Sequence, residues 1–276
     1  MPSALECTLW PRIACLVLFT TLGLFTAAPA WTDEDAGHEL ATAVHERPEG
    51  ADAVTRGTMT LSGGRRERVR ESYEYRLTPG DGERLELIRF TRPANIDGTA
   101  LLVHNHADGS TDQWLYLPAA DRVRRISSEN RGGSFVQSDL FFEDLEDRPP
   151  EKDTHRLLGD DLYQGTPVKL LESIPVSPDN SVYTRRLSWV HPEILIPLRI
   201  DLFGDGSDTP MKRFEVQAIE RIQGYWTVTE STMQHLERGT TTTLSVEEVI
   251  YDQGLPRELF RTRALADPAR ERRYRP

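Results

Sequence analysis

The chain has almost no cysteine. Its 276 residues contain two, Cys7 and Cys15, and both lie within the first 30 residues. If that segment is removed, the remaining chain has no thiol at all. Disulfide bonds, thiolate nucleophiles and thiolate metal ligands are then excluded. The stability of the fold must come mainly from the burial of apolar side chains.

The chain also lacks an apolar run long enough to cross a bilayer. Its longest run starts at Ile13 and ends near Phe25, which is shorter than the roughly 20 residues of a spanning helix and argues against a membrane anchor. Arg12 precedes the run and Ala28-Pro29-Ala30 follows it. A basic edge, an apolar core and a small-x-small site are typical of a secretory signal peptide. We therefore predict that residues 1–30 are a signal peptide, cleaved near Ala30, and that the mature protein is periplasmic.

An excess of positive charge is absent as well. The formal net charge is −11, which argues against a nucleic-acid partner, because neutralising phosphates requires clustered positive charge. Arginine-rich stretches occur at 65–70, 122–125 and 270–273. The first and last are interleaved with acids and are typical of solvated faces. The middle stretch is less diluted, so Arg122, Arg124 and Arg125 are candidate contacts for a lipid head group or a partner.

No linker, repeat or low-complexity tract divides residues 31–276, so we expect a single domain there. One early segment predicts a helix: residues 33–46 place Leu40, Ala41 and Val44 at helical spacing after an acidic first turn. Alternating polar and apolar residues predict strands almost everywhere else. These strands cover residues 54–61, 68–77, 85–91, 99–106, 112–118, 122–125, 168–176, 182–191, 194–203, 212–222, 225–235 and 240–251.

Consecutive strands joined by short turns indicate antiparallel pairing. We therefore predict a mainly β fold: a single large antiparallel curved sheet that forms an incomplete barrel. An open sheet this wide must curl, and its apolar face needs a cover. The N-terminal helix and short helical segments around 138–145 and 256–260 are the predicted lids.

The most distinctive stretch runs from residue 112 to residue 145. Trp114 and Tyr116 share one face of a predicted strand, and a Gly132-Gly133 loop follows. Ser138 then precedes acids, as in a capped turn. The bulky apolar residues around it suit a flap over a hydrophobic cavity, although ordinary core packing would explain them equally well. The candidate ligand-binding residues are Trp114, Tyr116, Phe135, Leu140, Phe141 and Phe142.

This pattern resembles the LolA-like outer-membrane lipoprotein-sorting family, in its longer branch often found beside RND-type exporters. The matching stretches are 90–101, 112–118, 124–126, 134–135, 138–139 and 143–145, with weaker matches at Met233, 240–243 and 256–260. One departure is Gln137, where the family pattern has a small residue, usually Gly. The departure puts the local geometry of the flap in question.

The resemblance implies an incomplete β-barrel with a helical lid around a cavity for acyl chains. It also implies a periplasmic carrier that takes lipid or lipoprotein from an inner-membrane exporter toward the outer membrane, with only transient membrane contact. Elementary chemistry agrees, since each buried methylene contributes roughly 0.8 kcal/mol and an apolar pocket can hold a chain by burial alone. Such a carrier needs no catalytic residue, metal or cofactor, and we predict none.

Three alternatives stay open at this point. The same fold could serve as a sensor that reads envelope lipids and passes a signal by protein contact. A lipid hydrolase could use Ser134 or Ser138, but the sequence has no Gly-x-Ser-x-Gly elbow. A metal could bind His104 and His106 with a nearby aspartate, but histidine pairs on strand edges are more often solvated.

Overall fold

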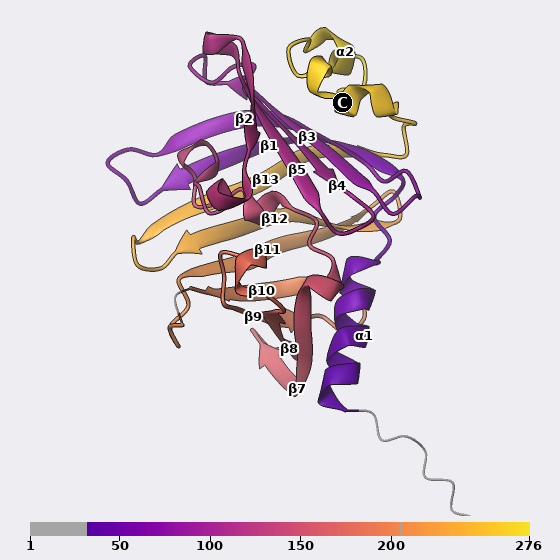
Figure 1. Ribbon diagram of the computed structural model, residues 1–276, viewed down its shortest axis with the longest axis vertical. Helices are drawn as coiled ribbons and strands as arrows, with labels where there is room; N and C mark the ends of the chain where they lie inside the picture. The colour runs from indigo at the N-terminus through magenta and orange to yellow at the C-terminus, as the bar shows by residue number, and fades with distance from the viewer. Residues whose placement is uncertain (1–31, 205) are drawn as a thin grey trace, which may run out of the picture. The chain divides into compact units, whose positions relative to one another are not determined.

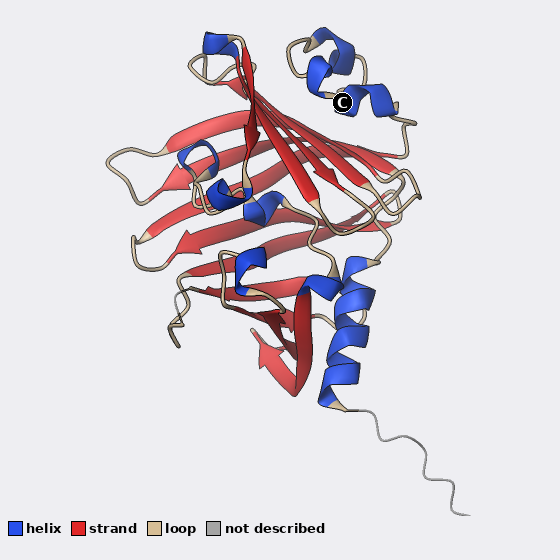
Figure 2. Cartoon of the chain, viewed as in Figure 1, coloured by secondary structure: helices blue, strands red, loops and turns tan. Residues whose placement is uncertain are grey.

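One meandering sheet accounts for most of the structure (Figures 1 and 2). The computed structural model describes residues 32–204 and 206–276. Its 13 strands pair in the order β6-β5-β4-β3-β2-β1-β13-β12-β11-β10-β9-β8-β7. The strands are β1 Asp52–Ser62, β2 Arg68–Leu77, β3 Arg84–Arg92, β4 Ala100–Asn105, β5 Thr111–Leu117, β6 Arg122–Ile126, β7 Asp153–Tyr163, β8 Thr166–Pro175, β9 Arg185–Val190, β10 Pro197–Phe203, β11 Lys212–Ile222, β12 Tyr225–His235 and β13 Thr240–Tyr251.

The strand order explains where the chain crosses the sheet. Every neighbouring pair is consecutive in sequence except β1 and β13. These first and last strands of the chain pair with each other in the middle of the sheet. The sheet edges are therefore β6 and β7, which are consecutive in sequence but unpaired. Residues 127–152 connect these two edges, and Figure 2 shows their short helical turns in front of the curved sheet. The sheet is thus a half-barrel whose open side is crossed by one connecting segment.

Helix α1, Asp33–His45, packs beside the β7 edge of the sheet (Figure 1). The Thr32 hydroxyl accepts from the amide of Asp35, and the Asp35 carboxylate accepts from the Thr32 amide, so a capping box starts the helix. A Cβ on Gly37 would lie 2.7 Å from the backbone of Arg156 in β7. Glycine therefore allows the close approach of helix and strand, and Ala41 is buried against Leu171 and Val190.

Strands β1, β3, β4 and β5 contribute apolar side chains to a cluster on each face of the sheet, whereas β2 does so on one face only, and each face is covered by a different segment. In β4, Leu101 and Val103 belong to the concave-face cluster, whereas Ala100 and Leu102 belong to the convex-face cluster. The flap, residues 131–145, covers the concave face. The C-terminal segment, residues 255–276, covers the convex face. It contains short turns at Arg257–Phe260 and Thr262–Ala264 and the helix α2, Ala269–Arg272.

The predicted fold class is confirmed: one antiparallel sheet, curved but unclosed, with an N-terminal helix and short helical turns. Strand β7 was not predicted. Its inward positions include Asp153 and His155, whereas Leu158 and Leu162 are exposed, so it lacks the alternation of polar and apolar residues that indicates a strand. The predicted lid at 138–145 is only partly helical, since its helical turn is confined to Glu143–Leu145.

The predicted signal peptide, residues 1–30, lies outside the described residues. Within the described ranges, no helix is long and apolar enough to cross a membrane. Residues Trp31–Pro276 form one compact unit.

Candidate functional site

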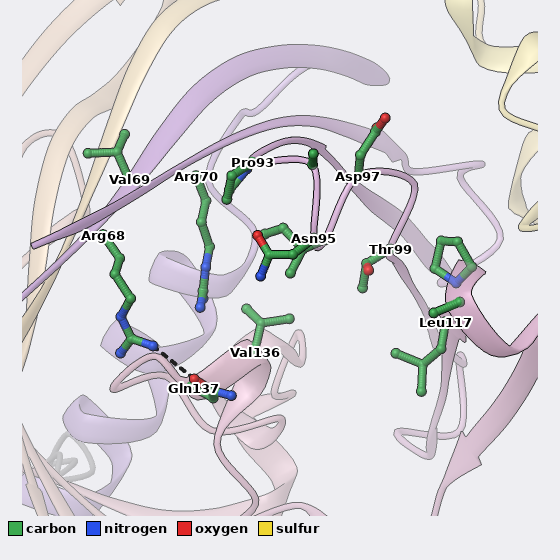
Figure 3. A pocket seen from close by; sticks show the side chains of 14 residues that line it. Arg68, Val69, Arg70, Pro93, Asn95, Asp97, Thr99, Leu117, Val136 and Gln137 are labelled. Carbon is green, nitrogen blue, oxygen red and sulfur yellow. Dashed lines mark hydrogen bonds between the residues drawn. The ribbon is translucent and has the colours of Figure 1, made fainter.

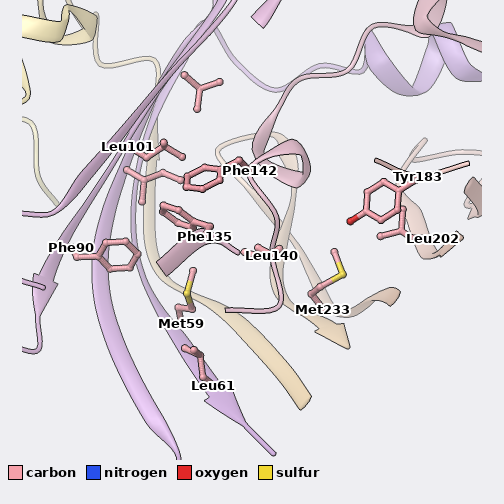
Figure 4. Packing of buried hydrophobic residues seen from close by; sticks show 12 residues of the cluster. Met59, Leu61, Phe90, Leu101, Phe135, Leu140, Phe142, Tyr183, Leu202 and Met233 are labelled. Atoms are coloured by element: carbon pink, nitrogen blue, oxygen red, sulfur yellow. The ribbon is translucent and has the colours of Figure 1, made fainter. Parts of the chain in front are cut away.

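The flap fills the concave face of the half-barrel with its own apolar side chains. Phe135, Leu140 and Phe142 are all buried there, with Phe135 at 0% exposure. Figure 4 shows Phe135 between Phe90 of β3 and Phe142, and the ring centroids lie 5.7 and 5.8 Å from that of Phe135. Burying each such side chain contributes about 1.5–3 kcal/mol. The flap therefore occupies the apolar space that the sequence assigned to a ligand.

Asp139 fastens the flap to strand β13. Its carboxylate accepts hydrogen bonds from the hydroxyls of Thr240, at 2.5 Å, and Thr242, at 2.8 Å. Its amide also donates to the Thr242 hydroxyl at 2.9 Å. Charge-assisted hydrogen bonds of this kind are about twice as strong as neutral ones. Two stretches of the family resemblance, 138–139 and 240–243, are thus one contact.

Asp144 fastens the other side of the flap to strand β11 and to Tyr183. It accepts from the ammonium of Lys212 at 2.5 Å and from the hydroxyl of Tyr183 at 2.7 Å. Lys212 is fully buried, and its Nζ lies 3.6 Å from the ring centroid of Phe141. Burial lowers the pKa of Lys212, and burial together with Asp144 raises the pKa of Tyr183. Removing either partner of such a pair leaves an uncompensated buried charge.

Glu143 adds a third anchor. Its carboxylate accepts from the amide of Val182 at 2.7 Å, from the guanidinium of Arg186 at 2.6 Å and from the hydroxyl of Ser181. Burial lowers the pKa of Arg186. The motif Glu143-Asp144-Leu145 is therefore a clamp that holds the C-terminal end of the flap.

The tip of the flap has strained backbone. Val136 and Gln137 both adopt the left-handed region, with φ of 45° and 63°. Non-glycine residues are uncommon there, and a β-branched residue costs of order 1–3 kcal/mol. The glycine expected at 137 would adopt this conformation freely. Here Gln137 keeps it, and its side chain accepts a hydrogen bond from Arg68 at 2.8 Å.

Open pockets adjoin the flap at its base and at its tip. One of about 410 Å³ lies at its base, between α1 and strands β8–β12. Apolar side chains such as Leu171, Val190 and Phe214 form part of its wall, and the clamp residues Glu143 and Asp144 form another part. A second pocket, of about 800 Å³, lies at the flap tip beside Val136 and Gln137. Both volumes fall within the usual range for small-molecule sites.

The structure divides the predicted ligand-binding residues between two faces. It brings Phe135, Leu140, Phe141 and Phe142 together in the flap. Trp114 and Tyr116 share one strand face, as predicted, but that face is the convex one beneath the C-terminal segment. Alternation along β5 instead places Gln113 and Leu115 toward the flap, and Gln113 donates to the Phe142 carbonyl at 2.8 Å. One cavity therefore cannot be lined by both sets.

The arginines of the middle basic stretch lie on β6, at the edge of the sheet. Arg122, Arg124 and Arg125 are exposed, and Arg125 forms an ion pair with Asp112. Whether they contact a head group or a partner stays a prediction.

The residues behind the alternative functions have structural contacts. The hydroxyl of Ser134 donates to the Ser138 carbonyl, and that of Ser138 donates to the Phe135 carbonyl at 2.7 Å, so both shape the flap. His104 contacts the Phe260 carbonyl through Nε2 at 2.5 Å, while His106 lies 3.2 Å from Asp112. No cluster of three or more possible metal ligands occurs within residues 32–204 and 206–276.

Comparison with known proteins now identifies the family. An outer membrane lipoprotein-sorting protein domain from Vibrio parahaemolyticus is 30% identical to the chain, with 84% of this chain and 99% of that one aligned and a TM-score of 0.80. The chain belongs to the LolA-like family. A family model described as an uncharacterized protein also matches residues 82–267.

Two further solved structures are similar to the chain. A DUF1329 family protein from Desulfovibrio piger is 29% identical over 85% of this chain and 99% of that chain, with a TM-score of 0.80. A LolA superfamily protein from Nitrosomonas europaea shares the fold at 16% identity, over 84% of this chain and 98% of that chain, with a TM-score of 0.64. A search of curated proteins finds no match to the chain.

Proposed function

We propose that this LolA-like protein is a periplasmic carrier that binds the acyl chains of lipids or lipoproteins and passes them toward the outer membrane. It would receive its cargo from an inner-membrane exporter, with an RND-type exporter as the proposed partner. One observation supports this most directly: the apolar concave face is covered by a segment that carries its own apolar side chains and is attached by side-chain contacts.

The physical basis is the exchange of like for like. Phe135, Leu140 and Phe142 already fill the concave face. An acyl chain that enters this space replaces the side chains of the flap with its own methylenes. Each methylene that it buries contributes roughly 0.8 kcal/mol. The energy needed to open the flap is set by the anchors at Asp139 and Asp144. A flap held in this way keeps the face covered when no cargo is present, so that it is not exposed to water.

Locking the flap tests whether it must open. Asp139→Cys together with Thr242→Cys would place a thiol on each side of the contact in which the Thr242 hydroxyl donates to the Asp139 carboxylate at 2.8 Å. Beyond residue 30 the chain has no other cysteine to interfere. We expect the oxidised double variant to exchange a fluorescent fatty acid slowly or not at all, and reduction to restore exchange. Each single-cysteine variant serves as the control.

If the oxidised and reduced forms exchange the probe equally fast, the flap does not guard the site. A second experiment tests the cargo itself: the protein is purified from envelope extracts and its bound lipids are identified by mass spectrometry. We expect acyl-containing molecules at close to one per protein. The absence of co-purifying lipid, together with failure to bind the fatty acid probe, would refute the carrier proposal.

A further inference from the structure

Arg70 of β2 is a buried guanidinium without an acidic partner. Its exposed fraction is 6%, and its one hydrogen-bond contact is a long one, 3.9 Å from Nη1 to the sulfur of Met59. Among the described residues no carboxylate lies within ion-pair distance of it. Burial and the neighbouring charge of Arg68 lower the pKa of Arg70. A buried charge without a partner is costly, and proteins rarely keep one without a use for it.

This guanidinium lines the pocket of about 800 Å³ at the flap tip. Figure 3 shows Arg68 and Arg70 extending side by side from β2 toward the flap tip, where Arg68 donates to Gln137. Apolar side chains form much of the remaining wall, among them Ile96, Leu117 and Val136.

The pocket has an uneven charge. Asp97 is the one acidic residue in its lining, and Figure 3 shows its carboxylate pointing away from the two arginines. The end of the pocket at Arg68 and Arg70 is therefore positive, and apolar side chains form most of its other walls. A ligand that complements both parts is an amphiphile with an anionic end.

We propose that this pocket binds the anionic head group of an acyl lipid, with Arg70 and Arg68 as its ligands and the apolar walls around the start of the chain. A carboxylate or a phosphate matches the planar donors of guanidinium, which form paired, charge-assisted hydrogen bonds to either group. The proposal rests on the carrier function and extends it, because it assigns the charge of the cargo and the end of the half-barrel where that charge sits.

Binding of the head group would also act on the flap. Arg68 now donates to Gln137, one of two strained residues at the tip. An anion that engages Arg68 competes with Gln137 for the same donor. Occupancy of the pocket therefore removes one of the contacts that hold the tip, so that the head group arrives where the flap is most easily loosened.

The test compares a charged and an uncharged probe of equal chain length. The full mature chain is titrated with a fluorescent long-chain fatty acid at mildly alkaline pH and with the methyl ester of the same acid. The variants are Arg70→Met and Arg68→Gln, and Arg263→Gln, at an exposed position of the C-terminal segment, is the matched control. Inorganic phosphate is added in a separate arm as a competitor.

We expect the wild type to prefer the acid over the ester by about tenfold or more, as loss of charged hydrogen bonds typically costs. Arg70→Met should abolish that preference and leave ester binding unchanged, whereas Arg263→Gln should keep it. The thermal midpoint of Arg70→Met should equal or exceed that of the wild type, because an unpaired buried charge is removed. This readout separates loss of binding from loss of folding.

Three outcomes would overturn the proposal. Equal affinity for acid and ester in the wild type would show that the arginines do not bind the head group, while the carrier function would stand. Retained preference in Arg70→Met would exclude Arg70. Displacement of the probe by phosphate at matching concentration would identify the ligand as a free anion. If neither probe binds the wild type, the carrier function itself fails.

Discussion

Each face of strands β1–β5 carries an apolar cluster, but the two clusters differ in how they are covered. On the convex face, the C-terminal segment buries Phe260 and Leu265 almost completely. A fully buried ion pair between Arg89 and Glu271, at 2.5 Å, attaches it. On the concave face, the flap buries Phe135 equally well. There, however, a strained tip and open pockets adjoin the cover.

The difference separates a structural face from a candidate site. On the convex face, the buried Arg89 of β3 is paired with Glu271 of the C-terminal segment and also donates to the Leu265 carbonyl. The concave cover leaves one buried arginine, Arg70, without an acid. A buried apolar face is not by itself evidence of a binding site. An unpaired buried charge beside an open pocket is such evidence.

The largest expected effect comes from a matched pair of truncations. Phe135→Ala and Phe260→Ala each remove a ring that is buried to 0% and 1% exposure, so each should lower the free energy of unfolding by about 3–5 kcal/mol. Only Phe135→Ala should change fatty acid affinity, and it should increase it, by roughly fourfold for each further methylene accommodated. Urea denaturation and probe titration measure the two effects. An equal change of affinity in Phe260→Ala would break the comparison.

The ion pair of the convex face provides the next test. Glu271→Gln leaves Arg89 charged at 1% exposure without a carboxylate, which should cost about 3 kcal/mol in the free energy of unfolding. Glu258→Gln is the control, because its pair with Arg261 is long, at 3.5 Å, and exposed, so its loss should cost under about 0.5 kcal/mol. Acyl binding should be unchanged in both variants. Similar stabilities of the two variants would mean that the segment is not held by this pair.

Lowering the pH should loosen both covers. Burial lowers the pKa of His104, which contacts the C-terminal segment, and of His235, which lies near the flap anchor. Below a pH of about 6.5 the unfolded chain takes up protons that the folded chain does not, so the free energy of unfolding falls as the pH falls.

Single variants assign that pH dependence to one face or the other. His104→Gln should reduce the acid-induced rise in amide hydrogen exchange in residues 255–276, and His235→Gln should reduce it in the flap. Equal reductions in both segments for either variant would show that the two covers are not independent.

The smallest effect is expected at the flap tip. Gln137→Gly relieves a left-handed residue but loses the hydrogen bond from Arg68, so the two changes should offset to within about 1 kcal/mol in the free energy of unfolding. With Arg68 released, affinity for the anionic probe should rise and affinity for its methyl ester should not. Thermal unfolding and probe titration test both parts. A fall in anion affinity would mean that Gln137 itself helps to bind the head group.

Much of the fold could be predicted from local sequence. The strands 68–77, 212–222, 225–235 and 240–251 have the bounds that alternation and turn residues indicated, and the first helix ends one residue earlier than predicted. These patterns repeat every two or 3.6 residues and are visible within a single element. Strand β7 was missed because polar residues, Asp153 and His155, occupy inward positions while Leu158 and Leu162 are exposed.

The candidate site was predicted only in part. The apolar flap was identified, because a glycine loop followed by a bulky apolar run is a local signal. The alternation at Trp114 and Tyr116 predicted a shared face, but β5 carries apolar side chains on both faces, and the pattern cannot tell which one meets the flap. The basic stretch 65–70 was interpreted as solvated, yet Arg70 is buried.

The sequence by itself determined the thiol-free chain beyond residue 30, the β-rich meander and the apolar run that follows the Gly132-Gly133 loop. The tertiary structure alone decided that this run covers a sheet face, which face it covers and which arginine it leaves without a partner. Asp139 meets Thr242 across 103 positions of sequence, and Arg68 meets Gln137 across 69. Contacts over such separations depend on how the sheet curls and where its edges end, and no local period encodes them.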